Sequence, residues 1–216
     1  MTTQLQPALT IDTSIPPAIT PIRQQLQIKG ALIMYVGNLE SYQGIDLLLE
    51  SFIHVLPQAP DAHIVAIGGT PEDIDKYQTL ASNYSISANV HFIGPRPIAH
   101  LKQYLEKADI LVSPRTQGNN TPMKLYSYLD SGKALLATNL TTHTQVLAAD
   151  QAPEMAYLAN PDAHDFGAGL LHLINHPNVR ETLGRAAQSY IAREHTYTAF
   201  SHKLNTLYDW LTQELT

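Results

Sequence analysis

The sequence lacks cysteine entirely and is short of positive charge. Without cysteine the chain can form no disulfide, no thiolate metal site and no cysteine nucleophile, which favours a reducing compartment, and we expect the cytoplasm. Thirteen lysine and arginine residues against nineteen aspartate and glutamate residues give a formal net charge of −6. No broad basic surface is then available to hold a nucleic-acid backbone, so nucleic acid is not expected as a partner.

Long apolar runs are absent as well. The longest, residues 31–36 and 134–137, fall far short of the roughly 20 residues that a membrane-spanning helix needs. Residues 1–20 have no basic start followed by an apolar block, so no secretion signal is expected. Residues 1–21 are rich in threonine, proline and glutamine, which predicts an extended tail or linker remnant before a folded domain at 22–216.

The rest of the chain alternates short apolar runs with segments of helical periodicity. The spacing predicts six strands, near residues 31–36, 63–67, 90–93, 110–112, 134–137 and 155–158, with helices between them and a helical carboxyl terminus from about residue 162. Continuous apolar strands between helices indicate a parallel sheet covered on both faces. We therefore predict a single doubly wound, Rossmann-like α/β domain whose ligand lies beyond the carboxyl ends of the strands.

The most informative stretch is residues 118–138, which has the pattern of a loop, a helix, a stop and a buried strand. Thr121 is suited to cap the helix, Pro122 to occupy its first turn and Gly132 to end it. The free N–H groups of that first turn, together with the helix dipole and Lys124, would form a phosphate cradle. The same features also occur in any well-capped helix between two strands, which is the alternative interpretation.

This stretch resembles the donor-site motif of retaining glycosyltransferases of the GT-B fold, group 1 type. Thr121-Pro-Met-Lys-Leu125 and the turn at Gly132-Lys133 carry the resemblance, and the order of elements from Ala31 to Trp210 is similar to the family's carboxyl-terminal, donor-binding half. In that family two glutamates flank the helix start, one holding sugar hydroxyls and the other the ribose. Asn119 and Ser127 stand at those positions here.

The loop after the first expected strand, from Gly37 to Gly44, is similar to the family loop that approaches the donor diphosphate. The family has an arginine and a lysine there, whereas this chain has Asn38 and Gln43, which donate hydrogen bonds without charge. The resemblance therefore implies weakened diphosphate binding. Arg115, after the fourth expected strand, would point toward the pocket and replace part of that charge; alternatively it pairs with Asp109, Asp130 or Glu40.

The resemblance implies a nucleotide-diphospho-sugar as ligand. Its phosphate and sugar site would comprise Gly37, Asn38, Gln43, Arg115, Asn119, Asn120, Thr121, Pro122, Met123 and Lys124. The nucleoside would contact Gly94, Pro95, Arg96 and Ser127, although residues 92–98 are also compatible with a simple proline-rich turn. No metal or cofactor is implied, since the spacing of His172 and His176 lacks the glutamate of a zinc-protease motif, and no catalytic residue is assigned.

Three functions remain open on the sequence. The chain is the donor-binding half of a retaining glycosyltransferase, active only with a separate acceptor domain or chain. Alternatively it is a degenerate, non-catalytic binding or interaction module, because two carboxylates and two cations are missing from matching positions. It is also compatible with a fragment or split gene product in which residues 13–30 correspond to the interdomain linker.

Overall fold

The computed structural model describes residues 21–148 and 153–214. The predicted tail, residues 1–21, lies outside the described residues except for Pro21. Within the described residues no helix is long and apolar enough to cross a membrane.

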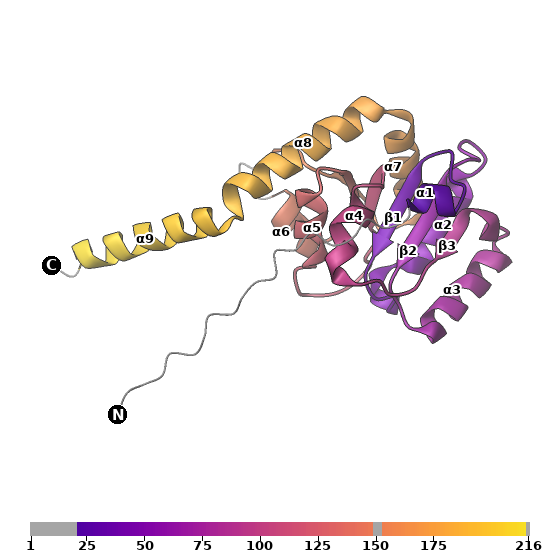
Figure 1. Cartoon of the computed structure of the whole chain (residues 1–216), viewed down its shortest axis with the longest axis horizontal. Helices are drawn as coiled ribbons and strands as arrows, with labels where there is room; N and C mark the ends of the chain where they lie inside the picture. Colours follow the sequence, from indigo (N-terminus) through magenta and orange to yellow (C-terminus); the bar gives the residue numbers. More distant parts are fainter. Residues whose placement is uncertain (1–20, 149–152, 215–216) are drawn as a thin grey trace.

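A six-stranded parallel sheet forms the centre of the domain (Figure 1). Its strands run in the order β3-β2-β1-β4-β5-β6, and their bounds are β1 Leu32–Val36, β2 His63–Ile67, β3 Val90–Phe92, β4 Ile110–Ser113, β5 Ala134–Thr138 and β6 Tyr157–Ala159. The chain proceeds outward from β1 to β3 and then returns to the other side of β1 with β4, where Ile33 is aligned with Ile110. The predicted doubly wound, Rossmann-like architecture is confirmed.

Helices cover both faces of the sheet, as the continuous burial of β4 and β5 requires. One face packs against α2 Ile45–Val55, α3 Pro71–Asn83 and α7 Ala163–Asn175, and its core contains Tyr35, Phe52 and Phe166. The other face packs against α1 Ile22–Gln25, α4 Leu101–Leu105, α5 Lys124–Asp130, α6 Thr141–Leu147 and α8 Pro177–Glu194. Side chains of β1 alternate between the two cores, Ile33 and Tyr35 toward the first and Leu32 and Met34 toward the second.

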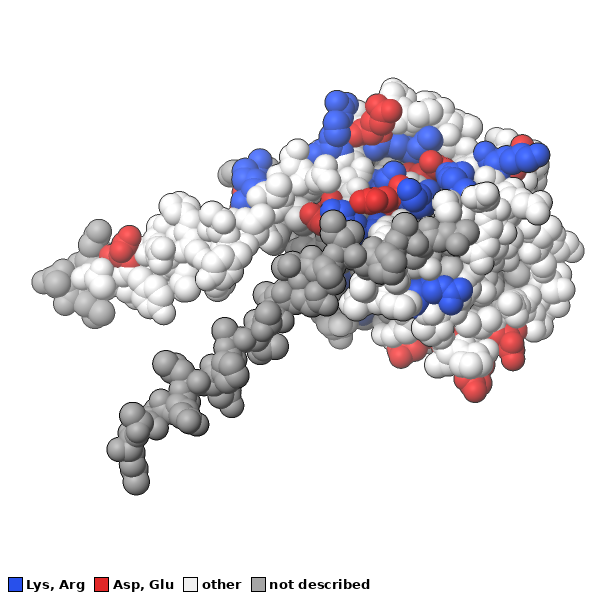
Figure 2. All heavy atoms as spheres, viewed as in Figure 1, with Lys and Arg blue, Asp and Glu red and all other residues white. Residues whose placement is uncertain are grey.

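Short 3-10 turns and one long helix complete the chain. The turns are η1 Ser41–Gln43, η2 Ser87–Asn89 and η3 Ile98–His100. Helix α9, Tyr197–Glu214, extends away from the rest of the domain (Figure 1). Figure 2 shows lysine and arginine side chains interspersed with acidic ones on the body of the domain.

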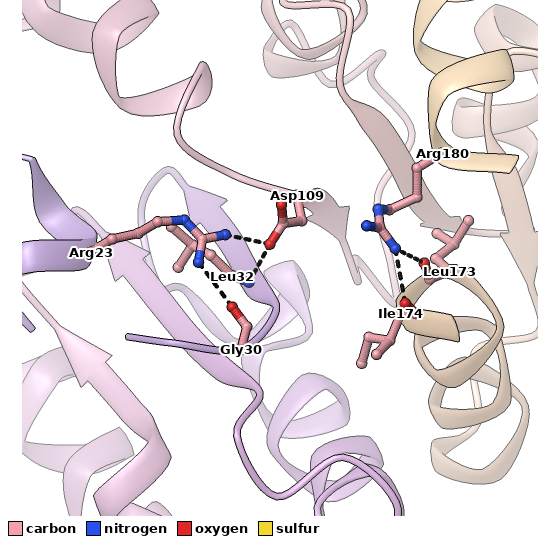
Figure 3. Close-up of polar contacts among 7 residues, drawn as sticks. All are labelled: Arg23, Gly30, Leu32, Asp109, Leu173, Ile174 and Arg180. Carbon is pink, nitrogen blue, oxygen red and sulfur yellow. Dashed lines mark hydrogen bonds and ion pairs between the residues drawn. The ribbon is translucent and has the colours of Figure 1, made fainter. Parts of the chain in front are cut away.

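Charged side chains connect the amino ends of β1 and β4 through hydrogen bonds and an ion pair (Figure 3). The Arg23 guanidinium donates to the Gly30 carbonyl at 2.8 Å and forms an ion pair with Asp109, whose carboxylate also accepts from the Leu32 N–H at 2.8 Å. On the neighbouring helices, Arg180 donates to the carbonyls of Leu173 and Ile174 and so satisfies the end of α7. These cations stabilise the fold at the end of the sheet opposite to the predicted site.

Candidate functional site

The candidate site lies at the carboxyl ends of β1, β4 and β5, where the strand order reverses. The loop after β1, the loop after β4 and the start of α5 meet there. The structure brings together Gly37, Gln43, Arg115 and Lys124 from the predicted set, and adds Tyr35.

Lys124 is the central side chain of this site. Its Nζ donates to the Tyr35 Oη and to the Gln43 Oε1, both at 2.8 Å, and lies 4.1 Å from the centre of the Tyr35 ring. Burial and the nearby charge of Arg115 lower the pKa of Lys124 to about 7. Both of its hydrogen-bond partners are neutral, and among the described residues no carboxylate pairs with it. Lys124 is thus a partly buried amine for which residues 21–148 and 153–214 supply no anionic partner.

Two features position Lys124. Tyr128, one turn further along α5, exchanges hydrogen bonds with the N–H and the carbonyl of Val36, at 2.7 Å and 3.2 Å, and so fixes α5 against the end of β1. Gly37 has a φ of 153°, and a Cβ there would lie 2.8 Å from the Lys124 Nζ. A side chain at this position would strain the backbone and displace the amine, so glycine favours the observed approach of the loop to Lys124.

Tyr35 is a site residue that the sequence did not reveal, because it stands within an apolar run that predicts a core strand. Its ring is fully buried, and its Oη donates to the Asn38 carbonyl at 2.6 Å while it accepts from Lys124. Burial raises the pKa of Tyr35 above its ordinary value, so the phenol stays protonated. Asn38 itself is exposed, and Gln43 is buried with its carbonyl oxygen committed to Lys124.

Arg115 holds the loop after β4 in place through hydrogen bonds. Only 4% exposed, it donates from Nε to the Gln117 carbonyl at 2.6 Å, and from its two terminal nitrogens to the Asn120 carbonyl at 2.9 Å and the Asn120 Oδ1 at 2.7 Å. Gly118, with a φ of 125°, allows the loop to fold over the guanidinium, since a Cβ there would lie 1.8 Å from an Arg115 nitrogen.

Both expectations for Arg115 need correction. The side chain does not lie open in a pocket, because the loop carbonyls surround it, and it forms no ion pair with Asp109, Asp130 or Glu40. Asp109 pairs with Arg23 at the other end of the strand. Arg115 therefore holds the loop in place and its charge lowers the pKa of Lys124, and it too has no carboxylate partner among the described residues.

The start of α5 differs from the prediction. The helix begins at Lys124, with Met123 at the N-cap position and no side-chain cap, so Thr121 does not cap it. Pro122 lies before the helix, where its carbonyl accepts from the Leu125 N–H at 3.0 Å in a tight first turn. The predicted stop is confirmed, because Gly132 has a φ of 68° directly after the helix. The entrance faces solvent: Met123, Asn119 and Asn120 are exposed.

A hollow of about 370 Å³ adjoins this entrance. Neutral side chains line it, namely Gln117, Gly118, Asn119, Leu140, Thr141, Thr142 and Gln145. The Thr142 Oγ1 is buried and has no hydrogen-bond partner among the described residues. Buried hydroxyls are normally paired, so the fold leaves this group unsatisfied beside the hollow. Among the residues that line this hollow, Asn119 belongs to the predicted site. Thr142 was missed because threonine at a helix start carries no specific signal.

His143 connects β5 to this region and was also missed. Its Nδ1 lies 2.8 Å from the Thr138 carbonyl, and its Nε2 lies 3.0 Å from the Ser113 Oγ. Burial lowers the pKa of His143 to about 4, so the ring is neutral, with Nδ1 as the donor and Nε2 as the acceptor. The Thr138 hydroxyl in turn donates to the Arg115 carbonyl at 2.5 Å. This buried network holds the ends of β4 and β5 together beneath the loop.

The residues predicted to contact a nucleoside lie on two separate elements. Gly94, Pro95 and Arg96 follow β3, and the Gly94 carbonyl accepts from the Gly68 N–H at 3.0 Å. Ser127 is exposed on α5, where it borders a separate hollow of about 240 Å³ with Ile98 and other residues of η3 and α4. The loop residues 94–96 do not line that hollow. Within the described chain no group of three or more metal-ligating side chains could hold an ion.

Comparison with known proteins gives a consistent result. A family model described as glycosyl transferases group 1 matches residues 19–190. The chain is 23% identical to the phosphatidyl-myo-inositol mannosyltransferase of Mycobacterium tuberculosis strain H37Rv over 168 aligned residues. The alignment covers 76% of this chain and 43% of that protein. The chain thus spans less than half the length of this relative.

Two solved structures show the fold. Anabaena HepE, crystallised in complex with UDP, matches with a TM-score of 0.74 and 16% identity over 87% of this chain and 51% of that one. The C-terminal domain of the group 1 protein LpcC from Francisella tularensis matches with a TM-score of 0.67 and 20% identity over 85% of this chain and 96% of that one. These likenesses establish a Rossmann-like half of a GT-B fold.

Proposed function

This chain belongs to the family of group 1 glycosyl transferases, and we propose that it is the donor-binding half of such an enzyme, holding a nucleotide-diphospho-sugar at the carboxyl ends of β1, β4 and β5. One observation carries the proposal: the Lys124 amine, which feels the charge of Arg115, has no carboxylate partner among the described residues. A buried cation is unfavourable unless an anion pairs with it. A diphosphate would supply that anion.

Lys124 is the group that would contact the diphosphate. Its present partners are a phenol and an amide, which a phosphate oxygen can replace with a stronger, charge-assisted hydrogen bond. The backbone N–H groups of Thr121 and Met123, just before α5, would add neutral donors. These groups would stabilise the departing nucleoside diphosphate without a metal ion, and the stereochemistry proposed for the transfer is retention.

The sugar would occupy the hollow beside Asn119. Side chains with amide and hydroxyl groups line the hollow, which suits a ligand rich in hydroxyl groups. The nucleoside would extend toward Ser127 and the loop of residues 94–96. Because HepE has been crystallised with UDP-glucose, that compound is the first donor to test.

Transfer would require a second domain that binds the acceptor, supplied by another chain or by another part of a longer protein. The alternative is a degenerate domain that binds without catalysis. The neutral side chains of Asn38, Gln43, Asn119 and Ser127, at positions where the resembling family has charged ones, favour this alternative. We place either form of the protein in the cytoplasm, on the absence of cysteine.

Titration calorimetry with uridine, guanosine and adenosine diphospho-sugars tests the proposal. We expect one donor to bind the wild-type chain, at least tenfold weaker binding by Lys124→Met, and unchanged binding by Lys107→Met, a control at an exposed lysine beyond α4. Failure of every donor to bind a folded chain would favour the non-catalytic module. Equal binding by the wild type and Lys124→Met would contradict the proposed site even if a donor binds.

A further inference from the structure

The hydroxyl of Tyr35 has a fixed direction for its proton. The Asn38 carbonyl, 2.6 Å away, can only accept, so the Tyr35 Oη donates its single proton there. Toward the Lys124 Nζ, 2.8 Å away, the same oxygen can then offer only a lone pair. Tyr35 is fully buried and burial raises its pKa, so the phenol keeps its proton and remains an acceptor toward the amine.

The N–H bonds of Lys124 can be counted in the same way. The Gln43 Oε1 is an amide oxygen and also accepts from the Nζ, at 2.8 Å. A neutral amine has two N–H bonds, which Tyr35 and Gln43 satisfy completely, whereas an ammonium ion has a third. In the part of the chain that the structure describes, no third acceptor binds this nitrogen. The fold thus satisfies the neutral amine and leaves the third N–H of the ammonium ion for an acceptor from outside.

Rigid parts of the fold hold the Tyr35 hydroxyl in place. Tyr35 is on β1, in register with Ala66 of β2, and the carbonyl that accepts its proton belongs to the loop after β1. A Cβ at Gly37 would lie 2.9 Å from the Tyr35 Oη and 2.8 Å from the Lys124 Nζ, so glycine lets this loop pass beside both atoms. Lysine has a flexible four-carbon stem, and a fixed acceptor therefore orients its amine.

We propose that Tyr35 is a positioning residue for donor binding: together with Gln43 it engages two N–H bonds of Lys124 and leaves the third for a phosphate oxygen of the donor. This inference rests on the proposed function, because it takes the donor diphosphate as the outside acceptor. Tyr35 is fully buried and acts through Lys124 rather than by touching the ligand. The phosphate binds the ammonium ion, so the hydroxyl that supports this ion also sets the pH range of binding.

Other groups near the amine do not change charge in that range. The titratable and charged groups around Lys124 and its phenol partner are Tyr35, Tyr42, Tyr77, Arg115, Tyr128 and His143. Arg115 stays charged and lowers the pKa of Lys124, while burial lowers the pKa of His143 to about 4 and keeps it neutral. Phenols ordinarily titrate at about pH 10, and burial raises the pKa of Tyr35 and Tyr128 further.

The variant Tyr35→Phe tests this role. It keeps the ring, whose centre lies 4.1 Å from the Lys124 Nζ, and removes only the hydroxyl. An ammonium ion that loses an acceptor is less favourable, so the midpoint of the pH-dependent loss of affinity should move down by about one pH unit. For UDP-glucose we expect about fivefold weaker binding than wild type at pH 7, and less than about twofold weaker binding at pH 5, where both proteins carry the ammonium ion. Titration calorimetry across this range measures both effects.

Tyr77→Phe is the matched control. Tyr77 is also fully buried, and its Oη accepts from a lysine, Lys76, at 3.2 Å, on α3 outside the hydrogen bonds of the site. This variant should change neither the affinity nor the midpoint. If Tyr35 served packing alone, Tyr35→Phe would weaken binding equally at pH 5 and pH 7 and leave the midpoint in place, and that result would refute the proposal.

A measurement without the donor separates this inference from the proposed function. In protein labelled with carbon-13 at lysine Cε, the signal that Lys124→Met removes reports the titration of Lys124 directly by NMR. Its midpoint should be lower in Tyr35→Phe than in the wild type, and an unchanged midpoint would overturn the inference even if a donor binds. A lower midpoint without binding of any donor would overturn the proposed function and still show that Tyr35 controls the Lys124 proton.

A second variant keeps the test decisive if Tyr35→Phe does not fold. Gln43→Met removes the other acceptor and leaves the phenol in place, so the Lys124 midpoint should fall in the same direction. An unchanged midpoint in this variant would contradict the count of N–H bonds on which the role of Tyr35 depends.

Discussion

The cationic side chains at the two ends of the central sheet differ in their partners. At the amino ends of the strands, Arg23 pairs with Asp109, and Arg180 satisfies carbonyls at the end of α7 (Figure 3). At the carboxyl ends, Arg115 is buried and holds loop carbonyls, whereas Lys124 is partly buried beside a phenol and an amide. Arg23, Arg180 and Arg115 therefore serve the fold, whereas the Lys124 amine is the cation available to a ligand. The comparison therefore separates structural cations from candidate binding cations in one domain.

Replacing Lys124 should have the largest effect on donor binding. We expect Lys124→Met to weaken donor binding by about 10-fold to 100-fold, since a charge-assisted hydrogen bond contributes roughly 1.5–3 kcal/mol. The same change should raise the free energy of unfolding at pH 6 by about 1–3 kcal/mol, because it removes a buried charge that lacks a partner. Calorimetry measures the first effect and urea unfolding the second. Weaker binding together with a less stable fold would mean that Lys124 is structural.

Removing Asp109 should lower the stability of the fold and leave donor binding unchanged. Asp109→Ala leaves the Leu32 N–H without its acceptor and Arg23 without its anion, so the free energy of unfolding should fall by about 1–3 kcal/mol. Donor affinity should stay the same, because this carboxylate is at the far end of β4. Thermal and urea unfolding measure the loss, with Glu106→Ala on the exposed end of α4 as the control. A change in donor affinity at unchanged stability would show that the two ends of the sheet are not independent.

The pKa of Lys124 makes donor binding dependent on pH. With a pKa of about 7 the amine loses its proton as pH rises from 6 to 8, and the donor binds the protonated form. The affinity for UDP-glucose, whose phosphates do not titrate in this range, should fall by about threefold to tenfold over that interval. Lys124→Met should show no such fall. Calorimetry in buffers of different ionisation enthalpy also measures the proton uptake, and a pH-independent affinity in the wild type would contradict this assignment.

The same pKa predicts the sign of the pH dependence of stability. In the unfolded chain Lys124 has its ordinary pKa of 10.5, and folding lowers it to about 7. Below pH 7 the amine is charged in both states and the fold bears the cost of burying it. Between pH 7 and 10.5 the unfolded state binds more protons, so the stability contributed by this group rises with pH. Comparing unfolding of the wild type and Lys124→Met across this range isolates that contribution.

The smallest expected effect concerns the hollow beside the loop. Thr142→Val keeps the shape of the side chain and removes the unpaired hydroxyl, so the stability of the fold should change by less than about 1 kcal/mol. Binding of UDP-glucose should weaken by about twofold to fivefold, and binding of UDP alone should stay constant. Calorimetry with both ligands measures this difference. An equal loss for UDP would place the nucleotide, and not the sugar, in the hollow.

The sequence anticipated some parts of this site and could not anticipate others. The helix start expected within residues 118–138 indicated Lys124 as a candidate, and the loop after the first strand, together with the family resemblance, indicated Gly37. The start of α5 was predicted two residues early, because Thr121 and Pro122 have the composition of a helix start while their backbone belongs to the preceding loop. Tyr35 and His143 were missed, since a tyrosine in an apolar strand and an isolated histidine have no distinctive neighbours in sequence.

The sequence by itself determined the architecture and the family of this protein. Continuous apolar strands alternating with amphipathic helices favour one layered arrangement, because only a parallel sheet covered on both faces buries them all. The role of each cation became clear only in the folded chain. Arg115 holds a loop, Arg23 pairs with Asp109, and Lys124 has no anionic partner among the described residues. Charge pairing depends on which strands lie side by side, and residues as distant in the chain as Arg23 and Asp109 meet only after the sheet has formed.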